Sequence, residues 1–295
     1  MWNFDVEYKE RLALAEEAVR KYLPKDDYAG RLCEAMCYAV EAGGKRIRPI
    51  LVYEGYRLFG GEGEEVYPFM AALEYIHTHS LIHDDLPALD NDDTRRGRPA
   101  THKAFGEALG VLSGDALLNH AYEVMTYGAL LTPRKENAIR AMQILAEKTG
   151  KGGMLGGQSV DVATEGMGLS SETLFYIYEK KTSALIEAGL MAGAALAGAS
   201  EEDLALLEKA GRNLGLAFQI QDDVLDEEGS EAELGKNLHS DEKNEKTTSV
   251  SLFGLSGSKE MAKTYTEGAK DALLSLGRDT RFLEELFDSL MGRRK

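Results

Sequence analysis

Helical periodicity is the feature that most limits the folds open to this chain. Apolar residues recur every three or four positions through nearly its whole length, as at Phe4, Tyr8, Leu12 and Ala15. The six prolines fall between these helical stretches or at their starts. The sequence contains no alternating run long enough to predict a β-strand, no short repeat and no domain boundary. It therefore predicts one all-α domain over residues 1–295.

Proline, glycine and capping signals place the ends of the expected helices. The stretch 150–157 holds five glycines and predicts a kink or a close contact between helices. The polar stretch 227–246 is interpreted as a mobile loop. The helices are expected at 4–22, 31–42, 50–59 (after a basic turn at 45–49), 68–84, 107–129, 132–149 (with Thr132 as its N-cap and Pro133 at its first position), 171–197, 201–226, 258–275 and 280–291.

The first chemically distinctive stretch is His83 to Pro99, which directly follows an apolar helical run. It contains five aspartates and three arginines within seventeen residues. Clustered carboxylates repel one another unless cations lie among them. Magnesium favours such hard oxygen ligands, and it is often bound by one or two carboxylates together with the phosphates of a substrate. The guanidinium groups of Arg95 and Arg96 suit phosphate oxygens. The stretch indicates a metal–diphosphate site, with a solvated charged loop as the alternative.

A second acidic cluster, Asp222 to Asp226, has a different backbone setting from the first. Pro87 is expected to end the helix that carries Asp84, so Asp90 must return to Asp84 through a bend. Asp222 and Asp226 are four residues apart, a spacing that puts both carboxylates on one face of a helix. We expect the two clusters to form opposite walls of one metal–diphosphate cavity.

Further marks accompany these clusters in a fixed order along the chain. With the clusters included, they are Gly43-Gly44-Lys45-Arg46-x-Arg48-Pro49, His77, Asp84-Asp85-x4-Asp90, Arg95-Arg96-Gly97, Gly114-Asp115, Gly157-Gln158-x2-Asp161, Lys181-Thr182, Gln219, Asp222-Asp223-x2-Asp226 and Gly235-Lys236. In this ordered set the chain resembles the trans-polyprenyl diphosphate synthases, of the bacterial farnesyl diphosphate synthase (geranyltranstransferase) type. The resemblance runs from about residue 30 to the end of the chain.

The resemblance implies a fold, a reaction and a set of partners. The fold would be a single-domain bundle of about ten or more helices around a central cavity, the isoprenoid synthase fold. The reaction would condense isopentenyl diphosphate with dimethylallyl or geranyl diphosphate to give farnesyl diphosphate, with geranylgeranyl diphosphate as the alternative product. About three Mg²⁺ ions in each active site and a homodimer are also implied.

The same resemblance assigns roles to individual residues. The implied metal ligands are Asp84, Asp85, Asp90, Asp222 and Asp226. Isopentenyl diphosphate is expected to bind Lys45, Arg48, His77 and Arg96, and the allylic diphosphate Arg95, Lys181 and Lys236. The catalytic set is Lys181, Thr182, Gln219, Asp84 and Asp222, in which the oxygen dipoles of Thr182 and Gln219 point at the carbocation. The departing diphosphate is expected to take the proton, so no side-chain base is assigned.

Product length is expected to depend on residues upstream of Asp84 on the same helix. His79 lies five residues before Asp84, which is roughly 7.5 Å along an α-helix. Farnesyl-producing bacterial relatives tend to carry an aromatic ring at this position. We therefore expect His79, with partial cover from Thr78, to form the floor of the hydrocarbon pocket. The alternative is that His79 packs against a neighbouring helix and that Tyr75 or a partner subunit sets the floor.

Composition excludes some classes of partner. The net charge of −16 argues against a nucleic-acid or anionic-membrane surface, because both require a basic face. Cys33 and Cys37 lie one helical turn apart and are expected to be reduced core residues. The N-terminal segment lacks the basic start and apolar block of a signal peptide, and no window approaches a membrane span. The protein is expected to be soluble and cytoplasmic, without a stable membrane anchor.

Three other functions are compatible with parts of the pattern. A class I terpene cyclase shares the first acidic motif, but it does not need the basic turn around Lys45 and Arg48. An HD-type metal phosphohydrolase is suggested by His77 and His83-Asp84, yet it leaves the second acidic cluster without a role. A non-catalytic partner subunit would typically lack aspartates from one cluster, and none is missing here.

Overall fold

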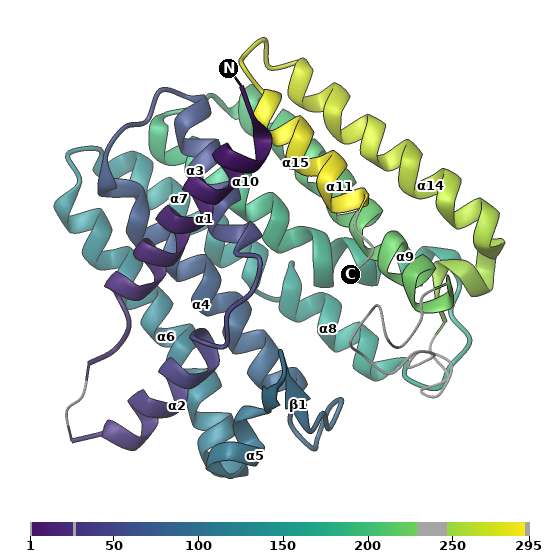
Figure 1. Ribbon diagram of the computed structural model, residues 1–295, viewed down its shortest axis with the longest axis horizontal. Helices are drawn as coiled ribbons and strands as arrows, with labels where there is room; N and C mark the ends of the chain where they lie inside the picture. Colours follow the sequence, from purple (N-terminus) through teal and green to yellow (C-terminus); the bar gives the residue numbers. More distant parts are fainter. Residues whose placement is uncertain (1, 26–27, 229–246, 293–295) are drawn as a thin grey trace. The chain divides into compact units, whose positions relative to one another are not determined.

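The computed structural model describes residues 2–25, 28–228 and 247–292, and it is helical nearly throughout (Figure 1). The predicted all-α class is confirmed. The strands of the described residues are β1 (Thr94–Arg95) and β2 (Arg98–Pro99), which pair antiparallel. The helices are α1 (Phe4–Lys21), α2 (Gly30–Val40), α3 (Ile47–Leu58), the 3-10 helix η1 (Glu64–Val66), α4 (Tyr67–Asp84), α5 (Thr101–Phe105), α6 (Glu107–Leu131), α7 (Lys135–Thr149), α8 (Met154–Ala163), α9 (Ser171–Ile177), the π-helix η2 (Tyr178–Ser183), α10 (Ala184–Ala197), α11 (Glu201–Glu228), α14 (Ser249–Leu274) and α15 (Arg281–Met291).

The chain divides into two compact units. Unit 1 comprises Met1–Gln143 and Ala192–Gly198, and unit 2 comprises Ile144–Met191 and Ala199–Lys295. The first acidic cluster and the basic turn therefore belong to unit 1, whereas the second acidic cluster and the Lys181-Thr182 pair belong to unit 2. That residues 1–295 act as one domain stays a prediction, as does the expectation that the two acidic clusters face one another.

Helix α4 is the centre of unit 1. Pro68 lies in its first turn, as the sequence predicts, because proline is preorganised for that position. The helix packs along α6 and also against α1 and α3 (Figure 1). Most of its side chains are buried, and the partly exposed ones near its C-terminal end are His77, Ser80, Leu81, His83 and Asp84. Apart from His83, these residues recur at three- and four-residue spacing, so they form one accessible stripe that ends at the acidic cluster.

Helix α11 organises unit 2. Its N-terminus is capped by Ser200, whose Oγ accepts a hydrogen bond from the Asp203 amide at 3.1 Å, and its first turn is acidic. The helix packs along α14 and against η2 (Figure 1). Its apolar side chains, such as Leu214 and Ile220, are fully buried. The helix thus faces the core and carries the second acidic cluster near its C-terminal end, which confirms that Asp222 and Asp226 lie on one helix.

Helix α10 is built from small apolar residues that allow close helix packing. A Cβ atom on Gly193 would lie 1.9 Å from the carbonyl oxygen of Val52 in α3. No side chain fits in that space, so the approach of the two backbones within unit 1 depends on glycine at this position. A rotation of α10 that brought a neighbouring residue to this position would therefore press a side chain against the Val52 carbonyl.

Several helix ends differ from the predicted ones. Thr132 ends α6, and α7 begins three residues later, at Lys135. The Thr132 hydroxyl donates to Glu65 at 2.5 Å and accepts from the Arg134 amide at 3.1 Å in the turn between the two helices. Helix α14 begins at Ser249, nine residues earlier than expected, and its start is fixed by a capping box at Thr248. Gly254 interrupts this helix with a φ of 72°, which breaks the helical periodicity there. Of the predicted loop 227–246, the first two residues belong to α11 and 229–246 lie outside the described residues.

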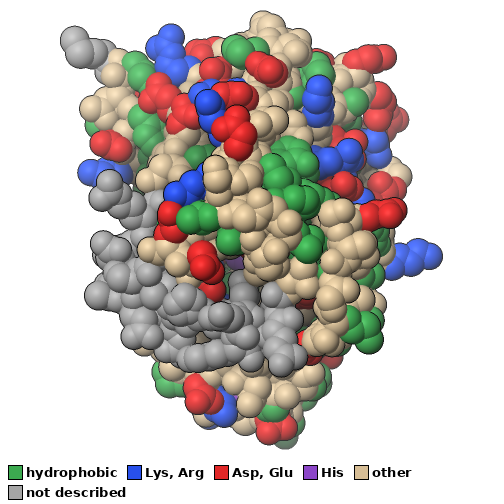
Figure 2. All heavy atoms as spheres, turned by 90° about the vertical axis from the view of Figure 1, so that its right-hand side faces the viewer, with side chains coloured by type: hydrophobic (Ala, Val, Ile, Leu, Met, Phe, Trp, Pro, Cys, Tyr) green, Lys and Arg blue, Asp and Glu red, His purple; other side chains and the backbone are tan. Residues whose placement is uncertain are grey.

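The surface is chemically mixed. Acidic and basic side chains of the described residues are interspersed with apolar ones on the face shown in Figure 2. Among the helices that the structure describes, none is both long and apolar enough to cross a membrane. Cys33 and Cys37 are free thiols of intermediate exposure, so they are not the buried core residues that the sequence predicts.

Candidate active site

The first acidic cluster begins where α4 ends. Asp84 is the last residue of the helix, and the chain then turns so that the Asp90 amide donates to the Asp84 carbonyl at 2.9 Å. The bend predicted from Pro87 is therefore present. Asp84 is partly exposed at the end of the accessible stripe, and Asp90 is exposed. Both carboxylates keep access to water, which a shared magnesium site requires.

Asp85 has a different surrounding from its two neighbours in the motif. Its carboxylate is only 2% exposed, and one oxygen accepts from both Nε (2.9 Å) and Nη2 of Arg95. Burial raises the pKa of Asp85, and the Arg95 guanidinium opposes that rise. Asp85 was predicted as a metal ligand. Its carboxylate pairs with Arg95 in the structure, and its role as a metal ligand stays a prediction.

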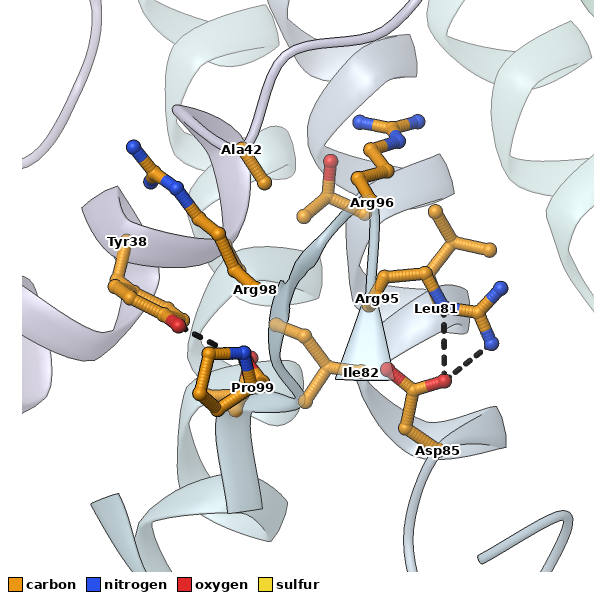
Figure 3. Close-up of a pocket in the computed structure, with 12 residues that line it drawn as sticks. Tyr38, Ala42, Leu81, Ile82, Asp85, Arg95, Arg96, Arg98 and Pro99 are labelled. Carbon is orange, nitrogen blue, oxygen red and sulfur yellow. Dashed lines mark hydrogen bonds and ion pairs between the residues drawn. The ribbon is translucent and has the colours of Figure 1, made fainter. Parts of the chain in front are cut away.

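The hairpin β1–β2 carries the arginines of the first motif (Figure 3). Arg95 lies over Asp85, and Tyr38 of α2 donates to the Pro99 carbonyl at 2.9 Å. Between α2, α4 and the hairpin lies a cavity of about 20 Å³, which has room for about one water. The turn depends on a positive φ at Arg96, 53°, an uncommon conformation for a residue with a side chain.

The basic turn is anchored by its middle arginine. Arg46 is 3% exposed and adopts a left-handed conformation with a φ of 48°. Its guanidinium donates to Glu74 of α4 at 2.6 Å, to Glu16 of α1 at 2.8 Å and to the Val40 carbonyl at 2.8 Å. Burial opposes its charge, but the two glutamates outweigh burial and raise the pKa of Arg46. Arg46 thus holds the turn, while Lys45 stays exposed.

Three of the four residues predicted for isopentenyl diphosphate lie together in unit 1. Arg48 Nη1 lies 3.3 Å from His77 Nε2, and Arg96 donates to the Gly43 carbonyl beside the basic turn. Burial lowers the pKa of Arg48 to about 10. The pKa of His77 is lowered well below its usual range, mainly by burial and next by the nearby charge of Arg48. His77 is therefore neutral near pH 7, and since arginine only donates, its Nε2 accepts. The cluster is a cationic surface with one neutral acceptor.

The two residues predicted to set product length point in different directions. His79 is buried, its Nδ1 lies 3.1 Å from the Gly114 carbonyl of α6, and its ring packs edge-on against His83. Thr78 is also buried and lines the cavity under the hairpin. Neither belongs to the accessible stripe of α4. The packing of His79 against a neighbouring helix matches the alternative that the sequence left open, and its role in product length stays a prediction.

In unit 2, Lys181 and Thr182 lie on the π-helix η2. Its wide turn is bridged by the Ser183 hydroxyl, which donates to the Tyr178 carbonyl at 3.3 Å. Single π-turns are frequent at functional sites. Lys181 Nζ lies 2.6 Å from Asp161 of α8, and the Thr182 hydroxyl donates to Gln219 of α11 at 2.9 Å. The predicted catalytic residues Lys181, Thr182 and Gln219 therefore lie on adjoining elements of unit 2.

The glycine-rich stretch 150–157, which runs into the first turn of α8, serves this arrangement. A Cβ on Gly157 would lie 2.3 Å from the Lys181 amide nitrogen, so α8 approaches η2 more closely than a side chain would allow. The predicted close contact between helices is confirmed. It is also what lets Asp161, one turn further along α8, reach the Lys181 ammonium.

Asp223, the middle residue of the second motif, is a buried hub. It is 5% exposed, and its Oδ2 accepts from the Ser249 amide (2.8 Å), the Ser249 hydroxyl (2.7 Å) and the Tyr178 hydroxyl. Its Oδ1 accepts from Gln219 Nε2 at 3.3 Å. Burial raises the pKa of Asp223, and these donors oppose the rise. Asp222 and Asp226 on either side remain partly exposed.

The exposed aspartates fit magnesium by their chemistry. Each motif offers two carboxylates with access to water, Asp84 and Asp90 in unit 1 and Asp222 and Asp226 in unit 2. Within the described part of the chain, no three histidine, cysteine or acidic side chains converge as a ready metal cluster. Magnesium does not need such a cluster when substrate phosphates and waters complete its shell. Lys236, predicted to bind the allylic diphosphate, lies outside the described residues.

Some positions that support the site were not identified from the sequence. Glu74 is 2% exposed and holds Arg46, and a lone carboxylate inside the apolar run of α4 was the available signal. Tyr178 and Ser249 hold Asp223, but they are far from it along the chain. No local pattern marks such partners, because only the packing of η2 and α14 against α11 brings them together.

Comparisons with known proteins agree with this geometry. The family model described as "Polyprenyl synthetase" matches residues 30–273. The chain is 41% identical to a farnesyl diphosphate synthase of Geobacillus stearothermophilus, over 88% of both chains, and 41% identical to a geranylgeranyl diphosphate synthase of Cyanophora paradoxa, over 90% of this chain and 88% of that one. A solved geranyltransferase of Helicobacter pylori, complexed with magnesium and isoprenyl diphosphate, is 30% identical and superposes with a TM-score of 0.84, covering 99% of this chain and 97% of that one. With its acidic motifs, basic turn and lysine–threonine pair in place, the chain belongs to the polyprenyl synthetase family.

Proposed function

We propose that this protein is a prenyltransferase that condenses isopentenyl diphosphate with dimethylallyl or geranyl diphosphate to give farnesyl diphosphate. The observation that carries the proposal is the cationic cluster of Arg48, His77 and Arg96 beside the accessible stripe of α4, which ends at Asp84. A site of this kind can hold one diphosphate by charge alone, next to carboxylates suited to a metal. The relatives named as farnesyl diphosphate synthase and geranyltransferase support the same reaction.

The chemistry assigned to this chain begins with ionisation of the allylic diphosphate. Breaking the carbon–oxygen bond leaves a carbocation and a free diphosphate, so cationic groups must stabilise the charge that develops. Arg95, held in place by Asp85, and Lys181, held by Asp161, supply two of these groups. We also assign Lys236 to this diphosphate from its position in the family pattern.

The homoallylic substrate is assigned to the cluster in unit 1. Lys45, Arg48 and Arg96 would contact its diphosphate, and the neutral His77 would complete the contact. Its double bond then attacks the carbocation, and the new cation loses a proton to the departing diphosphate. Thr182 and Gln219 offer oxygen dipoles that stabilise positive charge without forming a bond.

Magnesium is the metal that we assign to the acidic motifs, at about three ions in each active site. Asp84, Asp85, Asp90, Asp222 and Asp226 would hold it, and Asp85 would also orient Arg95. When bound, magnesium supplies positive charge for the leaving diphosphate. The Helicobacter pylori relative, complexed with magnesium and isoprenyl diphosphate, supports this assignment.

Two further assignments accompany the reaction. We propose a homodimer, because α6 carries large apolar side chains that remain exposed in the single chain, including Val111, Leu112 and Leu130. We also propose a cytoplasmic location. Geranylgeranyl diphosphate is the second candidate product, because His79 lies away from the accessible stripe, and the relative from Cyanophora paradoxa is consistent with it.

One assay tests the reaction. Purified protein is incubated with labelled isopentenyl diphosphate, magnesium and each allylic primer, and the dephosphorylated alcohols are separated by chromatography. Farnesol as the main product supports the proposal, and geranylgeraniol supports the second candidate. Cyclised hydrocarbons would indicate a terpene cyclase instead, and phosphate release would indicate a phosphohydrolase. No product in the absence of a partner chain would indicate a non-catalytic subunit.

A further inference from the structure

A directed chain of hydrogen bonds runs from Asp223 to Thr182 in unit 2. Gln219 Nε2 donates to Asp223 Oδ1 at 3.3 Å, and the Thr182 hydroxyl donates to Gln219 Oε1 at 2.9 Å. The chain begins at a buried side chain, since Asp223 is 5% exposed, and ends at two partly exposed ones. It therefore links the second acidic motif to the lysine–threonine pair on the π-helix.

The direction of this chain is set at Asp223. Its other oxygen, Oδ2, meets three donors from Tyr178 and Ser249, and such a group of donors favours a carboxylate that only accepts. A glutamine amide has one donating end and one accepting end, and its partners decide which way it lies. An acceptor at Asp223 Oδ1 therefore draws the NH₂ group of Gln219 and turns its carbonyl oxygen toward Thr182.

The hydroxyl of Thr182 has a single hydrogen, and the Gln219 carbonyl claims it. The lone pairs of the Thr182 oxygen then point away from Gln219. If Gln219 were reversed, its NH₂ group would donate to Thr182 and occupy one of those lone pairs. The Thr182 oxygen could thus be either electron-rich or partly blocked by a donor, depending on the direction of Gln219. The Asp223 carboxylate selects the electron-rich state.

We infer that Asp223 is a positioning residue for catalysis: through Gln219 it fixes the polarity of Thr182, so that an electron-rich oxygen is available to the allylic carbocation. This inference rests on the proposed function. It gives the buried aspartate of the second motif a role separate from metal binding. Asp223 itself does not touch substrate.

The test substitutes Asp223→Asn. The new side chain keeps its oxygen for the Ser249 and Tyr178 donors and turns its NH₂ group toward Gln219, which must then reverse. We expect kcat to fall about five- to tenfold, the effect of one neutral hydrogen bond, while the KM for each substrate stays within about twofold. The rate constant is measured in single turnover with saturating allylic diphosphate and magnesium.

A rescue variant separates polarity from packing. In the double variant Asp223→Asn/Gln219→Glu, the carboxylate moves to position 219 and accepts both from the amide introduced at position 223 and from Thr182, so the hydroxyl regains its original direction. We expect this variant to recover at least about half of the lost kcat on a logarithmic scale. Ser249→Ala is the matched control, because it removes one donor from Oδ2 without touching the bond to Gln219. It is expected to lower the melting temperature and leave kcat unchanged.

The outcomes are distinguishable. If wild type makes no prenyl product, the proposed function fails. If wild type is active and Asp223→Asn keeps the wild-type kcat, if the double variant is no faster than the single one, or if Ser249→Ala slows turnover as much, Asp223 acts only as a structural residue and the inference is overturned.

Should Asp223→Asn not fold, a cycle of Gln219→Met and Thr182→Val tests the bond through which Asp223 must act. The polarity chain predicts that the double variant is no slower than the slower single variant. Independent contributions, in which the two losses multiply, would contradict it.

Discussion

The middle aspartates of the two acidic motifs show two ways of holding a carboxylate out of water. Asp85 in unit 1 and Asp223 in unit 2 are 2% and 5% exposed, and each is followed by a more exposed aspartate of its motif. Asp85 is matched by the charge of Arg95, whereas Asp223 is matched by neutral donors from Tyr178, Ser249 and Gln219. The same Asp-Asp pair of letters therefore encodes an ion pair in one unit and a polar hub in the other.

The difference extends to what each aspartate controls. Asp85 immobilises a cation whose side chain is itself 34% exposed and suited to phosphate. Asp223 immobilises helix ends and an amide, because Ser249 opens α14 and Tyr178 opens η2. We expect substitutions in unit 1 to act mainly on diphosphate binding and substitutions around Asp223 to act mainly on turnover and stability.

The largest expected effect is the same for both motifs, so in this respect the two motifs do not differ. Asp84→Ala and Asp222→Ala should each lower kcat by about a hundredfold or more, because both remove a proposed metal ligand. EDTA should do the same to wild type. Circular dichroism checks the fold, and Asp93→Ala is the control, since this exposed aspartate of the first cluster is not a predicted metal ligand and pairs with Lys103. Full activity of either variant in magnesium buffer, or of wild type in EDTA, contradicts the metal assignment.

A second experiment tests whether unit 1 binds by charge. Arg48→Ala should raise the KM for isopentenyl diphosphate about tenfold, and more than the KM for the allylic primer, because a charge-assisted hydrogen bond is lost. Arg57→Ala on the same helix is the control, since that side chain is exposed and pairs only with Glu54 among the ion pairs of the described residues. Equal effects on the two KM values would remove Arg48 from the homoallylic site.

Asp85→Asn and Asp223→Asn, compared directly, sharpen the contrast. Asp85→Asn should raise the KM for the allylic diphosphate about fivefold, because Arg95 loses the charged partner that orients it. Asp223→Asn should leave that KM within about twofold. Steady-state kinetics with both substrates varied gives the two values. If both variants change the same kinetic constant, the proposed difference between Asp85 and Asp223 is wrong.

The cationic cluster also predicts a pH dependence. Arg48 has a pKa lowered to about 10, so it is protonated below that pH and loses its charge as the pH rises past it. The KM for isopentenyl diphosphate should therefore rise severalfold above about pH 10, while no inflection from His77 is expected near its usual value of 6.5, because its lowered pKa keeps it neutral. The KM for the allylic primer, measured in the same buffers, is the reference. A step between about pH 6 and 7 would show that His77 titrates near its ordinary pKa.

The smallest effect concerns product length. If His79 forms the floor of the hydrocarbon pocket, His79→Ala should lengthen the product, as judged by chromatography of the alcohols. Its packing against α6 predicts a modest shift at most, since the ring contacts Gly114 and His83. An unchanged product distribution would assign the floor to another residue, and Ser80 on the accessible stripe is then the next position to vary.

Local signals were enough for much of the fold. Pro68 and Ser200 mark true helix starts, and Pro87 correctly predicts the bend that returns Asp90 to Asp84. The spacing of Asp222 and Asp226 correctly places them on one helix. These features depend on neighbouring residues and on backbone stereochemistry, so the sequence contains what is needed to predict them.

Other features depend on contacts between distant segments. The pairing of Asp85 with Arg95 needs the positive φ of Arg96 that closes the hairpin, and the hub at Asp223 needs the arrival of Ser249. The start of α14 was missed because Gly254 breaks its periodicity. Helical pattern alone contains no information about which oxygen an aspartate presents to which donor.

The π-helix also shifts the helical reading frame locally. A wide turn advances the helix by fewer degrees per residue than an α-turn, so removing the extra residue from Tyr178–Ser183 would close this turn as an α-turn and leave the helix beyond it in nearly the same rotation. The extra residue therefore changes the direction of the side chains inside the turn, Lys181 and Thr182 among them, without changing the reading frame of the residues that follow.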